Sequence, residues 1–247
     1  MTLPAPFLLE QRGRIDSSND EARRLAQRGF GHGTVVTAVV QTAGRGRRGR
    51  AWMSSPGNLH CSFLLDPGSN PALSPQLTFV AAVALRDALA ELALAADFKV
   101  KWPNDILCND AKIAGMLLEQ AGSLVVLGVG VNVTAYPETA LYPATCLQKT
   151  GSGAEASDVL AGFCGQLARR YDQWRHEGFA PIRNAWLDVA FGKCEKMTAR
   201  LADETVREGV FAGLAADGAL ELLDDAGTIH RILAGDVFFR GLDASGN

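Results

Sequence analysis

Seven residues combine arginine with glycine in one run, GRGRRGR at positions 44–50. Glycine lets backbone amides approach a ligand closely, and arginine supplies permanently charged, forked donors that suit phosphate and carboxylate groups. The spacing does not fit GxxxxGKS/T, and Trp52 and Pro56 follow where a GxGxxG segment would open a helix. We interpret the run as a loop that wraps an anionic group and later releases it. The alternative is a solvated basic turn, because charge runs are usually exposed.

A second segment that suits chemistry is KWPND at 101–105. Lys101 stands at the end of an expected strand, and Pro103 stiffens the exit because it cannot continue a sheet ladder. A lysine here would neutralise a carboxylate that meets a phosphate, and Asp105 would hold Mg²⁺ or receive a proton. Taken alone, the segment fits a packed Trp-Pro corner with an Asn-Asp turn at least as well.

Two expected strands contain glycine, KIAGMLLE at 112–119 and GVGVN at 128–132. Glycine inside a strand often marks the close approach of a ligand or of another backbone. Gly115, Gly128 and Gly130 are therefore candidates for the wall of a binding site, with Lys112 and Asn132 as polar groups beside it. A β-bulge or tight strand packing would explain the same glycines.

The segment SSN at 17–19 offers two hydroxyls and a carboxamide, a mixture of donors and acceptors that suits a neutral polar head such as a urea. Helix capping is the alternative, because Ser18 and Glu21 fit a capping box at the start of a helix that would run to about Arg28.

The remaining pattern predicts one large domain and one small one. Apolar periodicity and turn residues favour helices at 18–28, 74–95, 155–176 and 180–190, and strands at 34–41, 58–65, 98–102, 105–120 (two strands around a turn) and 124–133. From about residue 192 short strands alternate with turns over roughly 50 residues, which is the size of an SH3-like barrel. We therefore predict a domain over residues 1–190 and a second over 191–247.

Composition narrows the classes of function. The net charge is −3, so the positive loop is a local feature, and the chain lacks the overall basic balance of most nucleic-acid binders. An RNA- or DNA-binding protein stays an alternative, one that predicts steeply salt-dependent binding to polynucleotide. Five cysteines without CxxC spacing predict reduced thiols, and the sequence has neither a secretory signal nor about 18 consecutive apolar residues. We expect a cytoplasmic protein without membrane contact.

The order and spacing of GRGRRG, KWPND, KIAGMLLE and GVGVN resemble those of the biotin protein ligases, over about residues 8–241. GVFAGLAADGALEL and AGDVFFR stand where that family has its SH3-like domain. The resemblance implies an α+β fold: a mixed, mostly antiparallel sheet flanked by helices, as in class II synthetase-like biotin/lipoate ligase catalytic domains, followed by a small C-terminal SH3-like β-barrel. It also implies ATP-dependent activation of biotin as biotinyl-5′-AMP and transfer of biotin to a lysine of a biotin carboxyl carrier domain.

The resemblance also implies roles for residues of this chain. Lys101 and Asp105 are the expected catalytic residues, with Asp105 also a candidate Mg²⁺ ligand. The expected biotin-binding residues are Ser17, Ser18, Asn19, Gln41, Gly44, Arg45, Gly46, Arg47, Lys101, Gly115, Gly128 and Gly130. The expected ATP-binding residues are Arg47, Arg48, Arg50, Lys101, Asn104, Lys112, Asn132 and Arg240.

Mg²⁺ with ATP, biotin and a biotin carboxyl carrier protein are the implied cofactor, substrate and partner. Some bacterial relatives carry an N-terminal winged-helix domain and repress biotin synthesis. The ligase pattern begins here within the first 20 residues, so we expect a monofunctional ligase that does not bind DNA. Family members can dimerise through an edge strand, and a homodimer is a further expectation. A lipoate or octanoyl transferase of the same superfamily is the alternative enzyme.

Overall fold

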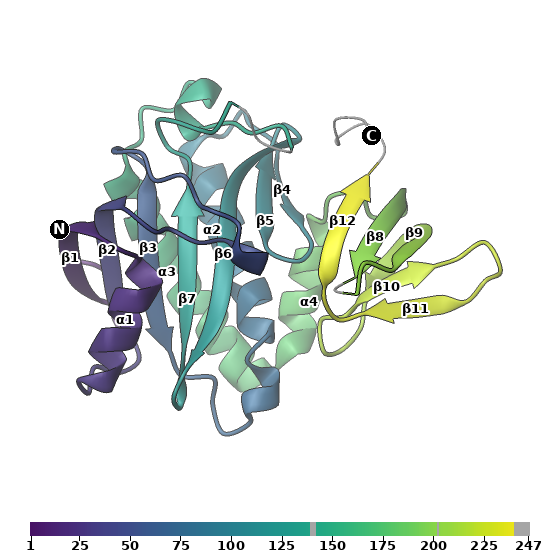
Figure 1. Ribbon diagram of the computed structural model, residues 1–247, viewed down its shortest axis with the longest axis horizontal. Coiled ribbons are helices and arrows are strands. Elements are labelled where there is room, and N and C mark those ends of the chain that lie inside the picture. The colour runs from purple at the N-terminus through teal and green to yellow at the C-terminus, as the bar shows by residue number, and fades with distance from the viewer. Residues whose placement is uncertain (139–141, 202, 240–247) are drawn as a thin grey trace.

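A seven-stranded sheet in the order β1-β2-β3-β7-β6-β5-β4 forms the centre of the larger part of the molecule (Figure 1). The structure is a computed structural model that describes residues 1–138, 142–201 and 203–239. β1 and β2 are parallel, and every other neighbouring pair in the sheet is antiparallel. The strands are β1 (Leu8–Ile15), β2 (Thr34–Gln41), β3 (Leu59–Leu65), β4 (Phe98–Lys101), β5 (Asp105–Cys108), β6 (Ala111–Ala121) and β7 (Leu124–Val131).

One face of this sheet carries the main hydrophobic core. Strand residues alternate between faces, so Phe63 and Leu65 of β3 and Leu127 of β7 point to the same side. They pack against α2 (Gln76–Leu92) and α3 (Ala156–Glu177), and the rings of Phe63 and Phe163 meet edge to face at 5.2 Å. α4 (Phe179–Asp188) follows α3 and packs beside α2.

The opposite face is covered by a helix over only part of its width. α1 (Ser18–Gln27) buries Ala22 and Leu25 against β2, β3 and β7. Beyond α1, the segment between β2 and β3 crosses in front of β7 and β6 as an irregular loop (Figure 1). This segment contains the GRGRRGR run, so the charged loop covers a stretch of the sheet that no helix occupies.

A second, five-stranded antiparallel sheet follows in the order β11-β10-β9-β8-β12. Its strands are β8 (Lys196–Leu201), β9 (Val206–Leu214), β10 (Leu220–Leu223), β11 (Ile229–Ile232) and β12 (Gly235–Phe239). The two sheets meet at the end strand β4, where the Val100 amide donates to the Val189 carbonyl at 3.0 Å and the Phe191 amide donates to the Val100 carbonyl at 2.8 Å. This junction also sets β12 beside the KWPND turn, which places both sheets at one cavity.

The α+β prediction is confirmed, with differences in detail. Strand β1 was not predicted, because its exposed edge position leaves no alternation of buried and exposed residues to read. The capping box at Ser18 and Glu21 is wrong: Ser17 is the N-cap residue and makes no side-chain cap bond, while the Ser18 hydroxyl lies against Gln41. The glycines of β6 and β7 do not interrupt their strands. The division at residue 190 stays a prediction.

The junction of the two sheets depends on the absence of a side chain at Gly192. Its φ is +71°, which L-residues rarely adopt, and a Cβ there would overlap the buried ring of Phe239. We expect Gly192→Ala to lower the free energy of unfolding by about 2–4 kcal/mol in urea titrations. Gly153→Ala is the matched control, because Gly153 has open space around it. Equal stability of the two variants would contradict this account.

Candidate active site

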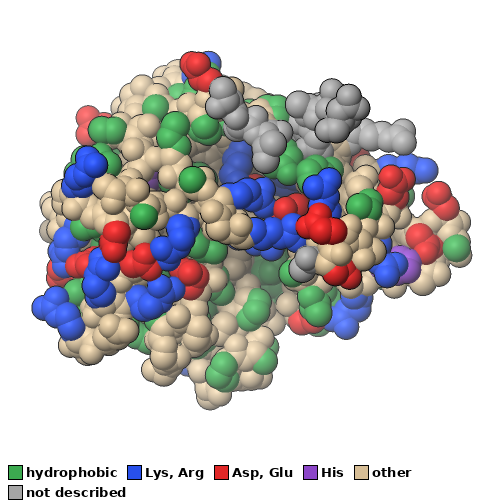
Figure 2. All heavy atoms as spheres, viewed as in Figure 1, with side chains coloured by type: hydrophobic (Ala, Val, Ile, Leu, Met, Phe, Trp, Pro, Cys, Tyr) green, Lys and Arg blue, Asp and Glu red, His purple; other side chains and the backbone are tan. Residues whose placement is uncertain are grey.

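A cavity of about 450 Å³ lies on the sheet face that carries the arginine-glycine loop. α1 bounds it at one end, β6 and β7 form its floor, and the KWPND turn and β12 bound it at the other end. Figure 2 shows Lys and Arg side chains gathered across the middle of this face, beside acidic side chains and around a hollow. The site therefore combines residues from both sheets.

The floor of the cavity is made of glycine. Gly115 of β6 pairs with Gly130 of β7, and Gly128 lies two residues earlier on the same face of the strand. The indole of Trp52, from the loop, lies directly on this floor. A Cβ on Gly130 would overlap the indole, and one on Gly115 would approach it to 3.1 Å. The glycines thus make room for a flat group on the sheet.

The end of the cavity near α1 is polar and buried. Ser17, Ser18 and Asn19 are each no more than 5% exposed. The amide and the hydroxyl of Ser18 both donate to Gln41 Oε1, at 2.7 and 3.0 Å. These bonds turn the Gln41 amide so that its Nε2 faces Gly44. The local sequence puts three polar residues at a helix start, but the hydrogen bonds with β2 give them their orientation.

Carboxylates hold the arginine-glycine loop at both ends. Arg45 forms a forked pair with Asp20 of α1, at 2.6 and 2.8 Å, and this guanidinium lowers the pKa of the Asp20 carboxyl. At the other end Arg48 and Arg50 both pair with Asp236 of β12, at 3.1 and 2.7 Å. The loop is thereby tied to α1 on one side and to the second sheet on the other.

Arg47 lies deeper than the other arginines of the loop. Its guanidinium donates to the Gly235 carbonyl at 3.2 Å and lies 3.5 Å from Asn104 Oδ1. Burial lowers the pKa of Arg47, while the nearby carboxylates of Asp236 and Asp105 act in the opposite direction. A half-buried guanidinium beside a cavity favours the entry of an anion, because charge interactions strengthen where water is partly excluded.

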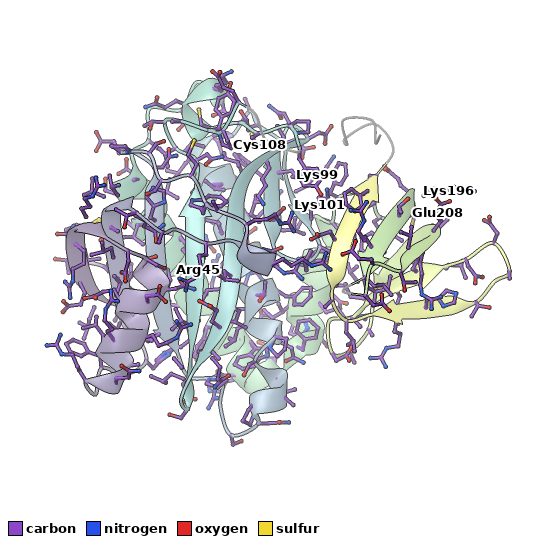
Figure 3. The ribbon with its side chains drawn as sticks, in the orientation of Figure 1. Arg45, Lys99, Lys101, Cys108, Lys196 and Glu208 are labelled. Atoms are coloured by element: carbon purple, nitrogen blue, oxygen red, sulfur yellow. The ribbon has the colours of Figure 1, made fainter. Side chains whose placement is uncertain are left out.

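Two lysines face the same end of the cavity. Lys101, only 7% exposed, lies at the end of β4 with its ammonium 4.8 Å from the ring centre of Tyr142 and 5.8 Å from that of Phe239. Figure 3 shows Lys101 between β4 and β12, whereas Arg45 lies in front of β7 toward α1. Lys112 Nζ pairs with Asp105 at 2.7 Å. Cationic groups from two strands and a loop therefore converge on one end.

Comparison with known proteins agrees with this geometry. Residues 13–133 match the Biotin/lipoate A/B protein ligase family, and residues 197–240 match the Biotin protein ligase C terminal domain. The chain is 40% identical to the biotin–[acetyl-CoA-carboxylase] ligase of Paracoccus denitrificans, over 92% of this chain and 99% of the relative. The chain belongs to the biotin protein ligase family.

Two further family members extend the comparison. The structure of the biotin protein ligase from Aquifex aeolicus in complex with biotin and ATP superposes with a TM-score of 0.82 at 30% identity, covering 94% of this chain and 98% of that one. The bifunctional ligase/repressor BirA of Bacillus subtilis is 34% identical over 90% of this chain and 71% of the relative. The match with the Aquifex protein spans both sheets.

The structure brings most of the predicted site residues of this family member together. The cavity lining includes Ser17, Ser18, Asn19, Gln41, Arg45, Gly46, Arg47, Arg50, Lys101, Asn104, Asp105, Lys112, Gly115, Gly128, Gly130 and Asn132. Gly44 and Arg48 do not line the cavity: Gly44 lies against Gln41 and the Trp52 carbonyl, and Arg48 pairs with Asp236, which does line it. Arg240 lies outside the described residues.

Sequence reasoning missed several residues at the site of this biotin protein ligase family member. Trp52 and Tyr142 line the cavity, and Asp236 binds two of the loop arginines. Ser62 and Glu119 bond with the polar residues of α1. A tryptophan inside a polar loop was a usable signal. Asp236 gave none, because it is close to the loop only in the folded chain.

In the described part of the chain, no three His, Cys, Asp or Glu side chains gather in a way that would hold a metal ion. The five cysteines are free thiols, and burial raises the pKa of Cys108 to about 11. None of the helices in the described ranges has the length and apolar character needed to cross a membrane.

The ion pairs at Asp236 predict how tightly the loop is closed. We expect Asp236→Asn to speed tryptic cleavage after Arg48 or Arg50 about fivefold, because losing ion pairs worth about 1 kcal/mol raises the population of the open loop. Asp225→Asn is the control, because Asp225 lies in the turn between β10 and β11 of the same part of the chain and its carboxylate is 3.7 Å from Lys196. Mass spectrometry locates the first cleavage. An unchanged rate of tryptic cleavage in a folded Asp236→Asn variant would show that Asp236 does not hold the loop closed.

Proposed function

We propose that this protein is an ATP-dependent biotin protein ligase. It activates biotin as biotinyl-5′-AMP and transfers the biotinyl group to a lysine in the carrier domain of acetyl-CoA carboxylase or a related carboxylase. One observation carries the proposal: a single cavity joins a buried polar end, a glycine floor and a cationic end. The Paracoccus relative bears the name of this activity, and the Aquifex relative binds biotin and ATP.

The first step brings two anions into contact. A biotin carboxylate oxygen attacks the α-phosphorus of ATP, the bond to the bridging oxygen breaks, and pyrophosphate leaves with the electron pair. Repulsion between carboxylate and phosphate must be cancelled in a site that excludes water. Lys101 is suited to bridge the two groups, because it is buried at the cationic end of the cavity. Arg47 supplies a second, half-buried cation at the same end.

The polar end near α1 takes the ureido head of biotin. A urea presents one acceptor oxygen and two N–H donors, and Ser17, Ser18, Asn19 and Gln41 offer both kinds of partner. Gly115 and Gly130 let the Trp52 indole lie on the sheet and Gly128 admits the Asn19 amide, so the flat part of the ligand packs against these groups over the glycine floor. The backbone of Gly44, Arg45 and Gly46 then approaches the biotin chain and the mixed anhydride.

The triphosphate and nucleotide take the end near β12. Arg48 and Arg50 now pair with Asp236, so they exchange this carboxylate for phosphate oxygens when ATP enters. Lys112 and Asn104 contact phosphate, and Asn132 contacts the nucleoside. We also propose that Arg240, from the predicted C-terminal domain, contacts the nucleotide.

Asp105 would hold Mg²⁺ together with phosphate oxygens and water. Mg²⁺ is commonly bound through one or two carboxylates plus substrate phosphates, and Asp105 offers one carboxylate, already beside Lys112, at the phosphate end. The ion would spread the negative charge of the leaving pyrophosphate.

In the second step the carrier lysine attacks the carbonyl carbon of the mixed anhydride, and AMP leaves. The amine must reach the site neutral, and Asp105 is placed to accept its proton. The anhydride is prone to hydrolysis, so the loop must cover it after pyrophosphate leaves and open for the carrier. Glycine at three positions of the loop allows this movement, and the arginines hold the closed form.

The wider partners stay predictions. The carrier protein, the homodimer and the absence of DNA binding each need a measurement in solution. For DNA, retention on polynucleotide at moderate salt would overturn our expectation.

The role of Lys101 predicts a loss of adenylation without a loss of fold. We expect Lys101→Ala to lower biotin-dependent ATP–pyrophosphate exchange about 10²–10³-fold, because a buried charge that stabilises the transition state is removed. Lys99→Ala is the matched control: Lys99 lies two residues earlier on β4 and pairs with Asp97 at 3.0 Å. Exchange at the wild-type rate in Lys101→Ala would remove Lys101 from the mechanism.

The proposed substrate is tested with wild-type protein, MgATP and one added acid at a time. We expect pyrophosphate exchange with biotin, and none with lipoate or octanoate, because neither carries a ureido group for the polar end. Exchange with lipoate or octanoate but not with biotin would leave the fold assignment unchanged and overturn the assignment of biotin as the substrate. A second assay, transfer of labelled biotin to a purified carrier domain, tests the second step.

A further inference from the structure

A chain of hydrogen bonds, buried at Ser62 and partly buried at Glu119, runs behind the polar end of the cavity. Asn19 Nδ2 donates to Glu119 Oε2 at 2.6 Å, and Ser62 Oγ lies 2.6 Å from Asn19 Oδ1 and 2.8 Å from Ser18 Oγ. Ser62 is fully buried on β3, and Glu119 lies on β6. Neither residue lines the cavity, yet both contact residues that do.

Glu119 decides the direction of this chain. Arg23 and Arg45 flank its carboxylate, at 3.2 and 3.9 Å, and a carboxylate accepts hydrogen bonds but donates none. Asn19 must therefore turn its NH₂ group toward Glu119 and its oxygen toward Ser62. Ser62 has a single proton, which it donates to Asn19 Oδ1, while the Ser18 hydroxyl donates its own proton to Gln41 Oε1.

The oxygen of Asn19 lies against the cavity floor. A Cβ on Gly128 would overlap Asn19 Oδ1, so the glycine lets this oxygen approach the backbone that lines the cavity. An amide oxygen has two lone pairs and Ser62 uses one of them. The second is available to a ligand N–H.

We propose that Glu119 is a positioning residue that fixes the Asn19 amide so that it accepts a ureido N–H of the substrate. The inference rests on the proposed function. It gives a reason why a carboxylate stands behind the site: with no fixed acceptor, the Asn19 amide could turn its donors toward the ligand. An Asn19 N–H facing a ureido N–H would leave both buried groups without a hydrogen-bond acceptor, which is unfavourable.

The test uses two cyclic carbamate analogues of biotin, in each of which an oxygen replaces one of the two ureido N–H groups. In the wild type we expect strong discrimination against the analogue whose new oxygen faces Asn19 Oδ1. We expect Glu119→Gln to reduce this discrimination, the ratio of kcat/KM for biotin over that analogue, about tenfold. A glutamine presents either end to Asn19, so the amide can turn. The KM for ATP and the ratio for the other analogue stay unchanged.

An exchange of partners separates positioning from a general effect on structure. In the double variant Asn19→Asp with Glu119→Gln, the glutamine donates to the aspartate and acceptor oxygens again face the cavity, with the net charge of the wild type. We expect the double variant to regain the discrimination. Glu10→Gln on β1 is the control for the charge change, because Glu10 pairs with Arg12 away from the cavity.

The outcomes are distinct. If Glu119→Gln folds and keeps the wild-type ratio, the inference is overturned and the proposed function stands. If the double variant folds and does not regain the ratio, the inference is likewise overturned, and this holds even where Glu119→Gln alone fails to fold. If wild-type protein shows no biotin-dependent ATP–pyrophosphate exchange, the proposed function is overturned, and so is the inference that rests on it.

Discussion

The arginine-glycine loop can stay on the sheet only because carboxylates hold it at both ends. Four guanidiniums in seven residues repel one another, and glycine leaves the backbone free to move. Asp20 forms an ion pair with Arg45 at one end, and Asp236 forms ion pairs with Arg48 and Arg50 at the other. Partly exposed ion pairs are each worth about 1 kcal/mol or less. Pairs of this strength can order a loop, and they are weak enough for the proposed exchange of a carboxylate for phosphate.

The position of Asp236 makes the second sheet part of the site. β12 supplies this carboxylate, the Gly235 carbonyl that meets Arg47, and the Phe239 ring beside Lys101. β4 in turn carries Lys101 and is closed at its edge by residues 189–191. A shift of one sheet relative to the other would therefore change the charge around the cationic end, which links the C-terminal domain to the chemistry.

The glycine floor answers a different requirement. A sheet normally presents side chains to whatever lies on it, and these would fill the cavity. Gly115 and Gly130 face each other across β6 and β7, so the Trp52 indole reaches the backbone itself. The polar end behind it is ordered by hydrogen bonds: Glu119 accepts from the Asn19 amide, which turns the Asn19 oxygen toward Ser62.

Much of this protein could be predicted from sequence because the information is local. Alternation and helical periodicity gave β2, β3, β7, α2 and α3 to within a few residues, and the GRGRRG, KWPND, KIAGMLLE and GVGVN segments identified the family. The spacing of Gly128 and Gly130 already put both on one face of a strand. Such features depend on neighbours along the chain, and they need no knowledge of packing.

Tertiary structure alone decided which groups face these segments. By sequence alone, Ser18 fits a helix cap. In the fold, Gln41 of β2 lies close enough to accept a hydrogen bond from the Ser18 hydroxyl. Glu119 and Asn19 are 100 residues apart and Arg48 and Asp236 are 188 apart, so no local pattern could pair them. Ion pairs and hydrogen bonds act over a few ångströms in space, whatever the separation in sequence. The sequence determined the residues that we propose bind the substrates, and the fold determined the partners that hold and orient them.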